Sequence, residues 1–208
     1  MTSAMQFSLF DRPNHFSEWF DALPTEGDPD GLRYYQREAF DAFYAGVERV
    51  RSQLIVKATG LGKTKLAAAI IKHWDKGDIL FVAHRDELIR QSENELLATT
   101  GYQIAIEKAG EVSSTKSHIV VGSVQSLNKK RLDRLGRNRF GLVIVDEAHH
   151  ATAKSYRDVL DWFHEAKVLG VTATPDRGDE KALGQVFDEV AYVMDIGDGV
   201  DAGFLVPI

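Results

Sequence analysis

Residues 54–64, Leu-Ile-Val-Lys-Ala-Thr-Gly-Leu-Gly-Lys-Thr, decide the fold of this chain. The apolar run at the start predicts a short buried strand, and the glycines after it predict a tight loop. Gly60 and Gly62 let the backbone turn its N–H groups toward an anion. A helix that begins at Lys63 would add the positive end of its dipole. The order of strand, loop and helix therefore predicts a phosphate-binding site.

The residue types in this stretch also assign roles within such a site. Lys63 is expected to reach the β- and γ-phosphates of a nucleotide, and the hydroxyl of Thr64 to ligate Mg²⁺. Lys57 stands where the strict pattern GxxxxGK[ST] has its first glycine, so a chance loop before a helix is the alternative. The strand and helix on either side favour nucleotide binding. The remaining expected nucleotide contacts are Thr59, Gly60, Leu61 and Gly62.

A second segment supplies two carboxylates at the end of another apolar run. Residues 142–145, Leu-Val-Ile-Val, predict a buried strand, and Asp146-Glu147-Ala148-His149 follows it directly. Asp146 is expected to hold Mg²⁺, and Glu147 to orient and deprotonate an attacking water. A solvated acidic turn is the alternative, because most carboxylates lie at the surface. Together with the glycine loop (residues 58–62), the pair predicts ATP hydrolysis.

Strand and helix signals alternate along the rest of the chain. Such continuous apolar strands suit a mainly parallel sheet with helices on both faces, so the predicted class is α/β. The site is then expected at the carboxyl ends of the strands. The predicted helices are 34–50, 63–74 and 86–98, and the predicted strands are 54–56, 79–82, 104–106, 119–121, 142–145 and 168–171.

Composition limits the class of protein. The chain has 208 residues, 44% of them hydrophobic, a formal net charge of −6 and no cysteine. It has no apolar run long enough for a membrane span and no secretory signal, so no membrane partner and a cytoplasmic location are expected. Residues 1–31 are predicted to be an N-terminal extension and 32–208 a nucleotide-binding domain, with the turn-rich segment 28–31 between them.

These motifs carry a family resemblance. Residues 146–149 spell a DEAH box, and residues 58–64 match the ATG-x-GKT form of motif I. The chain resembles the first RecA-like domain of superfamily 2 helicases, and within them the restriction-enzyme subunits and repair helicases. Four further segments resemble family motifs in the family's order. They are 32–36 (adenine recognition), 82–88 (motif Ia), 121–127 (motif Ib) and 171–175 (motif III).

The resemblance implies further roles. Arg33 would stack on adenine and Gln36 would hydrogen-bond its edge. Contacts to the nucleic-acid backbone would come from Arg85, Ser123 and Gln125, although the last two could instead cap a helix. Coupling between hydrolysis and nucleic-acid binding is implied for His149, Thr172 and Thr174.

Two features outside these motifs are interpreted from the sequence alone. His150 is expected at the surface, without a role. The basic stretch 129–139 has two possible interpretations, a solvated helix face or a nucleic-acid contact, and the sequence does not decide between them.

The predicted function is an ATP-dependent helicase or translocase motor acting on nucleic acid, DNA rather than RNA. The resemblance implies a second RecA-like domain that supplies an arginine finger, worth roughly 10³–10⁵ in turnover, so weak hydrolysis is expected without it. A nuclease domain or another subunit is a further expected partner. The alternatives are the translocating subunit of a type I or type III restriction enzyme, and a non-catalytic module switched by nucleotide.

Overall fold

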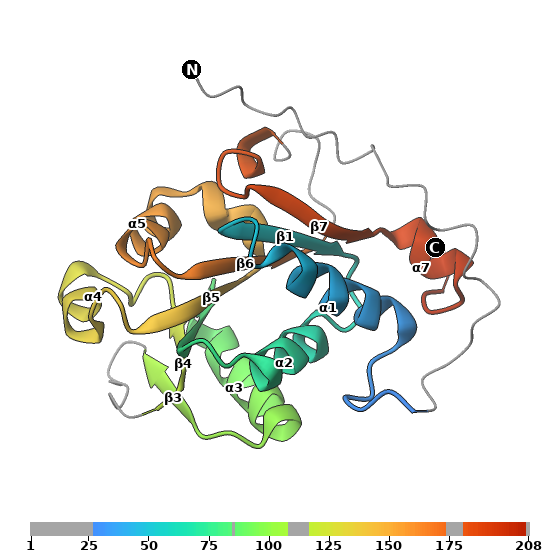
Figure 1. Ribbon diagram of the computed structural model, residues 1–208, viewed down its shortest axis with the longest axis horizontal. Helices are drawn as coiled ribbons and strands as arrows, with labels where there is room; N and C mark the ends of the chain where they lie inside the picture. Colours follow the sequence, from blue (N-terminus) through green and yellow to red (C-terminus); the bar gives the residue numbers. More distant parts are fainter. Residues whose placement is uncertain (1–26, 85, 108–116, 174–180, 207–208) are drawn as a thin grey trace.

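The fold is built on one parallel sheet. A computed structural model describes residues 27–84, 86–107, 117–173 and 181–206. Its seven strands are all parallel and follow the order β3-β4-β2-β5-β6-β1-β7 (Figure 1). The strands are β1 (Ser52–Lys57), β2 (Asp78–Ala83), β3 (Ile104–Glu107), β4 (Ile119–Ser123), β5 (Phe140–Asp146), β6 (Lys167–Thr172) and β7 (Glu189–Met194).

Helices connect the strands and cover both faces of the sheet (Figure 1). None of the helices in the described ranges is long and apolar enough to cross a membrane. The helices are α1 (Tyr34–Gly46), α2 (Lys63–His73), α3 (Asp86–Thr100), α4 (Lys129–Leu135), the 3-10 helix η1 (Ala148–Thr152), α5 (Lys154–Trp162) and α7 (Ile196–Asp201).

Two hydrophobic cores lie on opposite faces of the sheet, because successive side chains of a strand point to opposite sides. In β1, Ile55 packs with α1, α2 and α3, whereas Leu54 and Val56 pack with α4 and α5. The same alternation occurs in β5, where Ile144 and Val143 belong to different cores. Burial on both faces explains why these strands read as continuous apolar runs.

The strand order brings distant segments to one edge. The connection from β1 to β2 through α2 skips two strands, so that β5 and β6 lie between them. At their carboxyl ends Val56 of β1 pairs with Thr172 of β6, and Asp146 of β5 pairs with Val171. Ala83 of β2 pairs with Ser123 of β4. The glycine loop, the two carboxylates and motif III therefore meet at the same edge.

The expected fold is confirmed, although helices α5 and α7 were not predicted. Three further differences concern α1, β7 and the N-terminal extension. Helix α1 ends at Gly46 rather than at residue 50. Strand β7 was not predicted, because only the last of its six residues is buried and it does not stand out as an apolar run. Residues 28–30 are tied to the domain, since Arg37 forms ion pairs of 2.8 Å with Asp28 and Asp30. Most of the predicted extension, residues 1–26, lies outside the described residues.

Candidate ATP-hydrolysis site

The glycine loop uses backbone conformations that favour glycine. Gly60 has φ 89° and Gly62 has φ 71°, and Gly62 is the residue from which α2 begins. A Cβ added at Gly62 would also come within 2.4 Å of the Gln36 side-chain nitrogen. The left-handed conformation favours glycine at position 62, and any larger residue would also have to displace the Gln36 amide from the loop. Of the other expected contacts, Thr59 is exposed and Leu61 is buried.

Gln36 holds this loop. Its side chain is buried, and its Nε2 donates to the carbonyl oxygens of Leu61 at 3.3 Å and Gly62 at 3.1 Å. Its Oε1 accepts from the backbone N–H of Arg33 at 2.9 Å. Both polar groups of Gln36 are thus engaged inside the protein, a set of partners different from the adenine edge that the sequence predicted.

Arg33 also has partners within the protein. It is exposed at the start of α1, and its guanidinium lies over the ring of Phe204, 5.0 Å from the ring centre. Its Nη1 donates to the hydroxyl of Tyr35 at 3.0 Å. The stacking face that the sequence assigned to adenine is therefore shared with Phe204.

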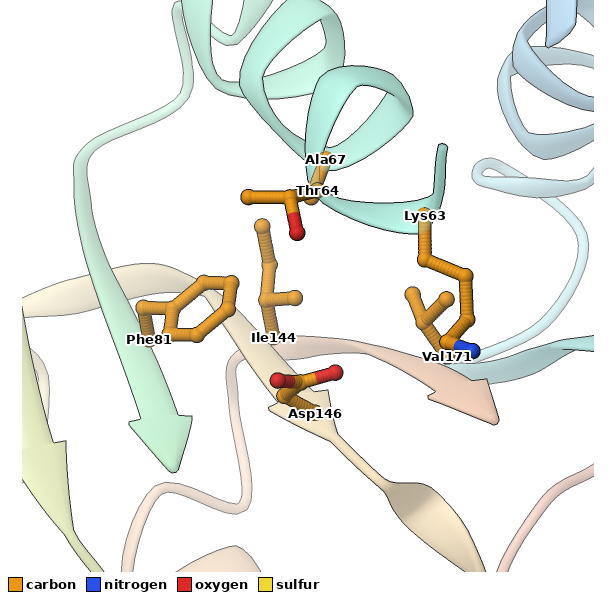
Figure 2. A pocket seen from close by; sticks show the side chains of 7 residues that line it. All are labelled: Lys63, Thr64, Ala67, Phe81, Ile144, Asp146 and Val171. Atoms are coloured by element: carbon orange, nitrogen blue, oxygen red, sulfur yellow. The ribbon is translucent and has the colours of Figure 1, made fainter. Parts of the chain in front are cut away.

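Lys63, Thr64 and Asp146 line one pocket, together with apolar residues of β2, β5, β6 and α2 (Figure 2). In Figure 2 the Thr64 hydroxyl and the Asp146 carboxylate turn toward each other across the pocket. The Lys63 amine reaches down beside Val171, where it donates to the carbonyl oxygen of Lys57 at 3.4 Å. The pocket thus gathers a cation, a hydroxyl and a carboxylate from two segments far apart in sequence.

The two carboxylates have different surroundings. Burial, and then the neighbouring charge of Glu147, raise the pKa of Asp146, whose Oδ1 accepts the Glu147 N–H at 3.0 Å. Glu147 is about one-third exposed, and its φ of 49° is the one positive value among the described non-glycine residues. Such a conformation costs about 1 kcal/mol or more and is often found at functional sites. No sequence pattern predicted this conformation.

His149 connects the carboxylates to β6. Its Nδ1 is hydrogen-bonded to the Oγ1 of Thr172 at 3.0 Å and lies 3.4 Å from Oε2 of Glu147. The Thr172 side chain is buried. The pair that the sequence predicted to couple two sites is therefore in direct contact, and Thr174 lies outside the described residues.

Comparison with known proteins identifies the family. Residues 30–177 match the family described as "Type III restriction enzyme, res subunit". The chain belongs to this family. The matched segment begins just before α1 and includes the glycine loop, the Asp146-Glu147 pair and Thr172.

Individual members and solved structures agree with this assignment. The chain is 30% identical over 196 residues to a type I restriction enzyme EcoAI endonuclease subunit of Escherichia coli, covering 88% of this chain and 24% of that protein. It is 31% identical over 189 residues to the DNA 3'-5' translocase XPB2 of Sulfurisphaera tokodaii, which covers 86% of this chain and 41% of that protein. The fold is also similar to a solved structure, a nuclease-deletion mutant of the type ISP restriction-modification enzyme LlaGI in complex with a DNA substrate mimic. The TM-score is 0.63 at 17% identity, and the match covers 83% of this chain and 20% of that chain.

These similarities establish a helicase-type RecA-like ATPase domain within this restriction-enzyme family. The resemblance to superfamily 2 inferred from the motifs is confirmed. The chain spans about a quarter of the length of the restriction subunit that it matches.

The residues predicted to contact nucleic acid do not form one exposed set. Ser123, at the end of β4, is 0% exposed, and its Oγ accepts the N–H of Ser126 at 3.3 Å. Its side chain therefore stabilises a turn, in line with the capping role that was the alternative, and its contact with nucleic acid stays a prediction. Gln125 is exposed nearby, and Arg85 lies outside the described residues.

The basic stretch is largely structural. Arg131 forms an ion pair of 2.6 Å with Glu107, which is 0% exposed, and Arg134 pairs with the same carboxylate. Arg139 forms an ion pair with Asp78. Arg137 lies over the ring of Trp162 at 4.2 Å. These side chains attach α4 and the start of β5 to the domain.

Proposed function

We propose that this domain binds Mg-ATP, hydrolyses it and drives movement along DNA. The observation that carries the proposal is the convergence of Lys63, Thr64 and Asp146 on one pocket, with Glu147 beside it. These groups come from a glycine loop and a strand end, where a parallel sheet usually builds its site. Phosphoryl transfer needs mainly positioning and charge neutralisation, which these groups can supply.

Within this proposal each residue has one role. The Lys63 amine neutralises the β- and γ-phosphates, and the backbone N–H groups of residues 59–62 surround them. Glu147 orients the attacking water and accepts its proton. His149 holds Glu147 and Thr172 together through the contacts at 3.4 and 3.0 Å.

The residues of the pocket fit a magnesium ion. A hydroxyl and a carboxylate offer the hard oxygen ligands that Mg²⁺ prefers, and the ion usually takes its other ligands from phosphates and water. Thr64 and Asp146 would hold the ion, which would neutralise charge on the triphosphate.

Two relatives support DNA as the nucleic acid along which the domain moves. Relatives include a restriction-enzyme subunit and a protein named as a DNA translocase, and the proposal takes its substrate from them. It also includes a second RecA-like domain elsewhere in the full-length protein. Similarity to the restriction subunit supports a second candidate function, that of a motor subunit that moves DNA for a nuclease.

The presence of Lys63 and Glu147 favours these two functions over a non-catalytic module switched by nucleotide.

Calorimetric titration with Mg-ATP tests the nucleotide site directly. Lys63→Ala removes the cation that faces the phosphates, so binding should become too weak to detect. Lys130→Ala, an exposed lysine of α4, is the matched control and should bind like the unmodified protein. Equal affinity for Lys63→Ala and the unmodified protein would remove the glycine loop from the proposal.

A further inference from the structure

Three histidine rings lie in contact, one after another, beside the hydrolysis site. The rings of His150 and His84 are stacked, with centroids 3.8 Å apart and planes 19° from parallel, whereas the rings of His149 and His150 have centroids 4.0 Å apart and planes tilted by 47°. All three side chains are partly buried. His150, which the sequence placed at the surface without a role, is therefore the middle member of the stack. We call His84, His150 and His149 the histidine stack.

One end of the stack reaches the reacting groups. His149 contacts Glu147 and Thr172, at 3.4 and 3.0 Å. Glu147 has a strained backbone conformation, which persists only when neighbouring residues hold it in place. A displacement of the His149 ring would therefore reach the group proposed to activate water.

The other end is anchored at the end of β2. His84 follows Ala83, the last residue of β2, and its Nδ1 is hydrogen-bonded to the hydroxyl of Tyr156 at 3.3 Å. The Tyr156 ring lies parallel to that of His84 within 5°. Burial raises the pKa of Tyr156 above its ordinary value. Tyr156 of α5 thus holds the orientation of the His84 ring.

The stack connects two segments that are far apart in the sequence. His84 follows β2 and His149 follows β5, the neighbouring strand of the sheet, and the two residues belong to different motifs. His84 lies within segment 82–88, where the family resemblance implies that the next residue, Arg85, contacts nucleic acid. Packed aromatic rings transmit displacement because protein interiors are stiff and close-packed.

We propose that His150 and His84 are positioning residues that couple nucleic-acid binding at the end of β2 to ATP hydrolysis at Glu147. This inference rests on the proposed function, since it requires turnover that nucleic acid stimulates. A shift of the β2 end on binding would move His84, then His150, and then His149 against Glu147. The stack would carry the same coupling in reverse, from nucleotide to nucleic-acid affinity.

The test compares turnover with and without saturating double-stranded DNA in the full-length protein. The quantity is the stimulation ratio, which a purely structural loss of packing would not change selectively. His150→Ala should lower the ratio at least about fivefold, a typical coupling factor. His150→Phe keeps a flat ring and should restore most of it. His164→Ala, an exposed histidine after α5, is the matched control and should keep the ratio unchanged.

A double-mutant cycle assigns the effect to the His84–His150 contact. If the two rings act as one unit, His84→Ala and the double variant should lower the ratio by the same factor as His150→Ala alone. His84→Ala also replaces His150→Ala if that variant does not fold, which thermal unfolding would reveal. Multiplied effects in the double variant would overturn the assignment.

The remaining outcomes separate this inference from the function beneath it. If the unmodified protein is stimulated by DNA and His150→Ala is stimulated equally, the inference is wrong and the proposed function stands. If Mg-ATP is not hydrolysed faster with DNA even in the unmodified protein, the proposed function fails and the inference fails with it.

Discussion

Lys57 buries an amine beneath the glycine loop. The side chain is 0% exposed, and its Nζ has no hydrogen-bond partner among the described residues. The amine lies 4.6 Å from the centre of the Tyr35 ring. Burial, with smaller contributions from Lys63 and Arg33, lowers the pKa of Lys57 to about 7. A charged amine is therefore costly at this position.

Replacing this amine should change how stability depends on pH. Above a pKa of about 7 folded Lys57 is neutral, whereas unfolded Lys57 keeps its proton up to its ordinary value of 10.5. The unfolded state then binds more protons, so stability rises with pH in that window, by on the order of 1 kcal/mol per pH unit. Lys57→Met removes this dependence.

Urea unfolding between about pH 7 and about pH 9 measures how the contribution of Lys57 to stability changes with pH. The stability of the unmodified protein relative to Lys57→Met should increase with pH across this range. Lys130→Met, at an exposed lysine, should show no such trend. A constant difference between the Lys57→Met variant and the unmodified protein would contradict a depressed pKa.

Gln36 offers a second prediction at a single residue. Because both of its polar groups hold the loop and Arg33, Gln36→Ala should weaken ATP and GTP alike, by about tenfold for the lost hydrogen bonds. Titrations with both nucleotides give the ratio of affinities. Gln185→Ala, an exposed glutamine, serves as control. Selective loss of ATP affinity would instead favour the base-edge contact that the sequence predicted.

Single residues mark the limit of sequence reasoning here. A shared pocket for Lys63, Thr64 and Asp146 could be predicted, because both motifs follow apolar strands and parallel strands place such segments at one edge of the sheet. The contacts of Gln36 and the burial of Ser123 depend on how α1 and β4 pack. No pattern in one sequence encodes those tertiary contacts.

At the scale of elements, one buried carboxylate attaches α4 to the sheet. Glu107 ends β3 and pairs with Arg131 and Arg134 of α4. Glu107→Gln removes the buried charge that both guanidinium groups share and should lower the free energy of unfolding by about 3 kcal/mol. Glu48→Gln breaks an exposed pair with Lys76 and should have no measurable effect.

Thermal or urea unfolding of both variants measures this difference. An effect of Glu107→Gln no larger than that of Glu48→Gln would show that α4 does not depend on the buried carboxylate. The arginines of α4 would then again be candidates for a nucleic-acid contact.

Elements differ in how well the sequence predicts them. The central strands were predictable because both of their faces are buried, which produces unbroken apolar runs. β7 lies at the edge of the sheet and is partly exposed along most of its length, so its residues carry a weaker signal. The end of α1 was placed too late, since the apolar spacing continues to Val47 past the last helical residue.

Across the whole molecule, the strand order explains why the site exists. The order β2-β5-β6-β1 puts four carboxyl ends side by side, and each is followed by a segment with a proposed role. The glycine loop follows β1, the carboxylates end β5, Thr172 ends β6 and His84 follows β2. The sequence predicted that these segments share an edge, whereas the histidine stack that joins two of them was visible only in the structure.

The most direct test distinguishes the roles of the two carboxylates, Asp146 and Glu147, in the full-length protein. Glu147→Gln keeps the shape of the side chain and loses its basicity, so Mg-ATP should bind nearly as before while turnover falls by at least about a hundredfold. Asp146→Asn should weaken both Mg-ATP binding and turnover, because it removes a proposed metal ligand. The measurement is Mg-ATP affinity and turnover for both variants. Turnover by Glu147→Gln equal to that of the unmodified protein would show that Glu147 is not the base and would contradict the mechanism.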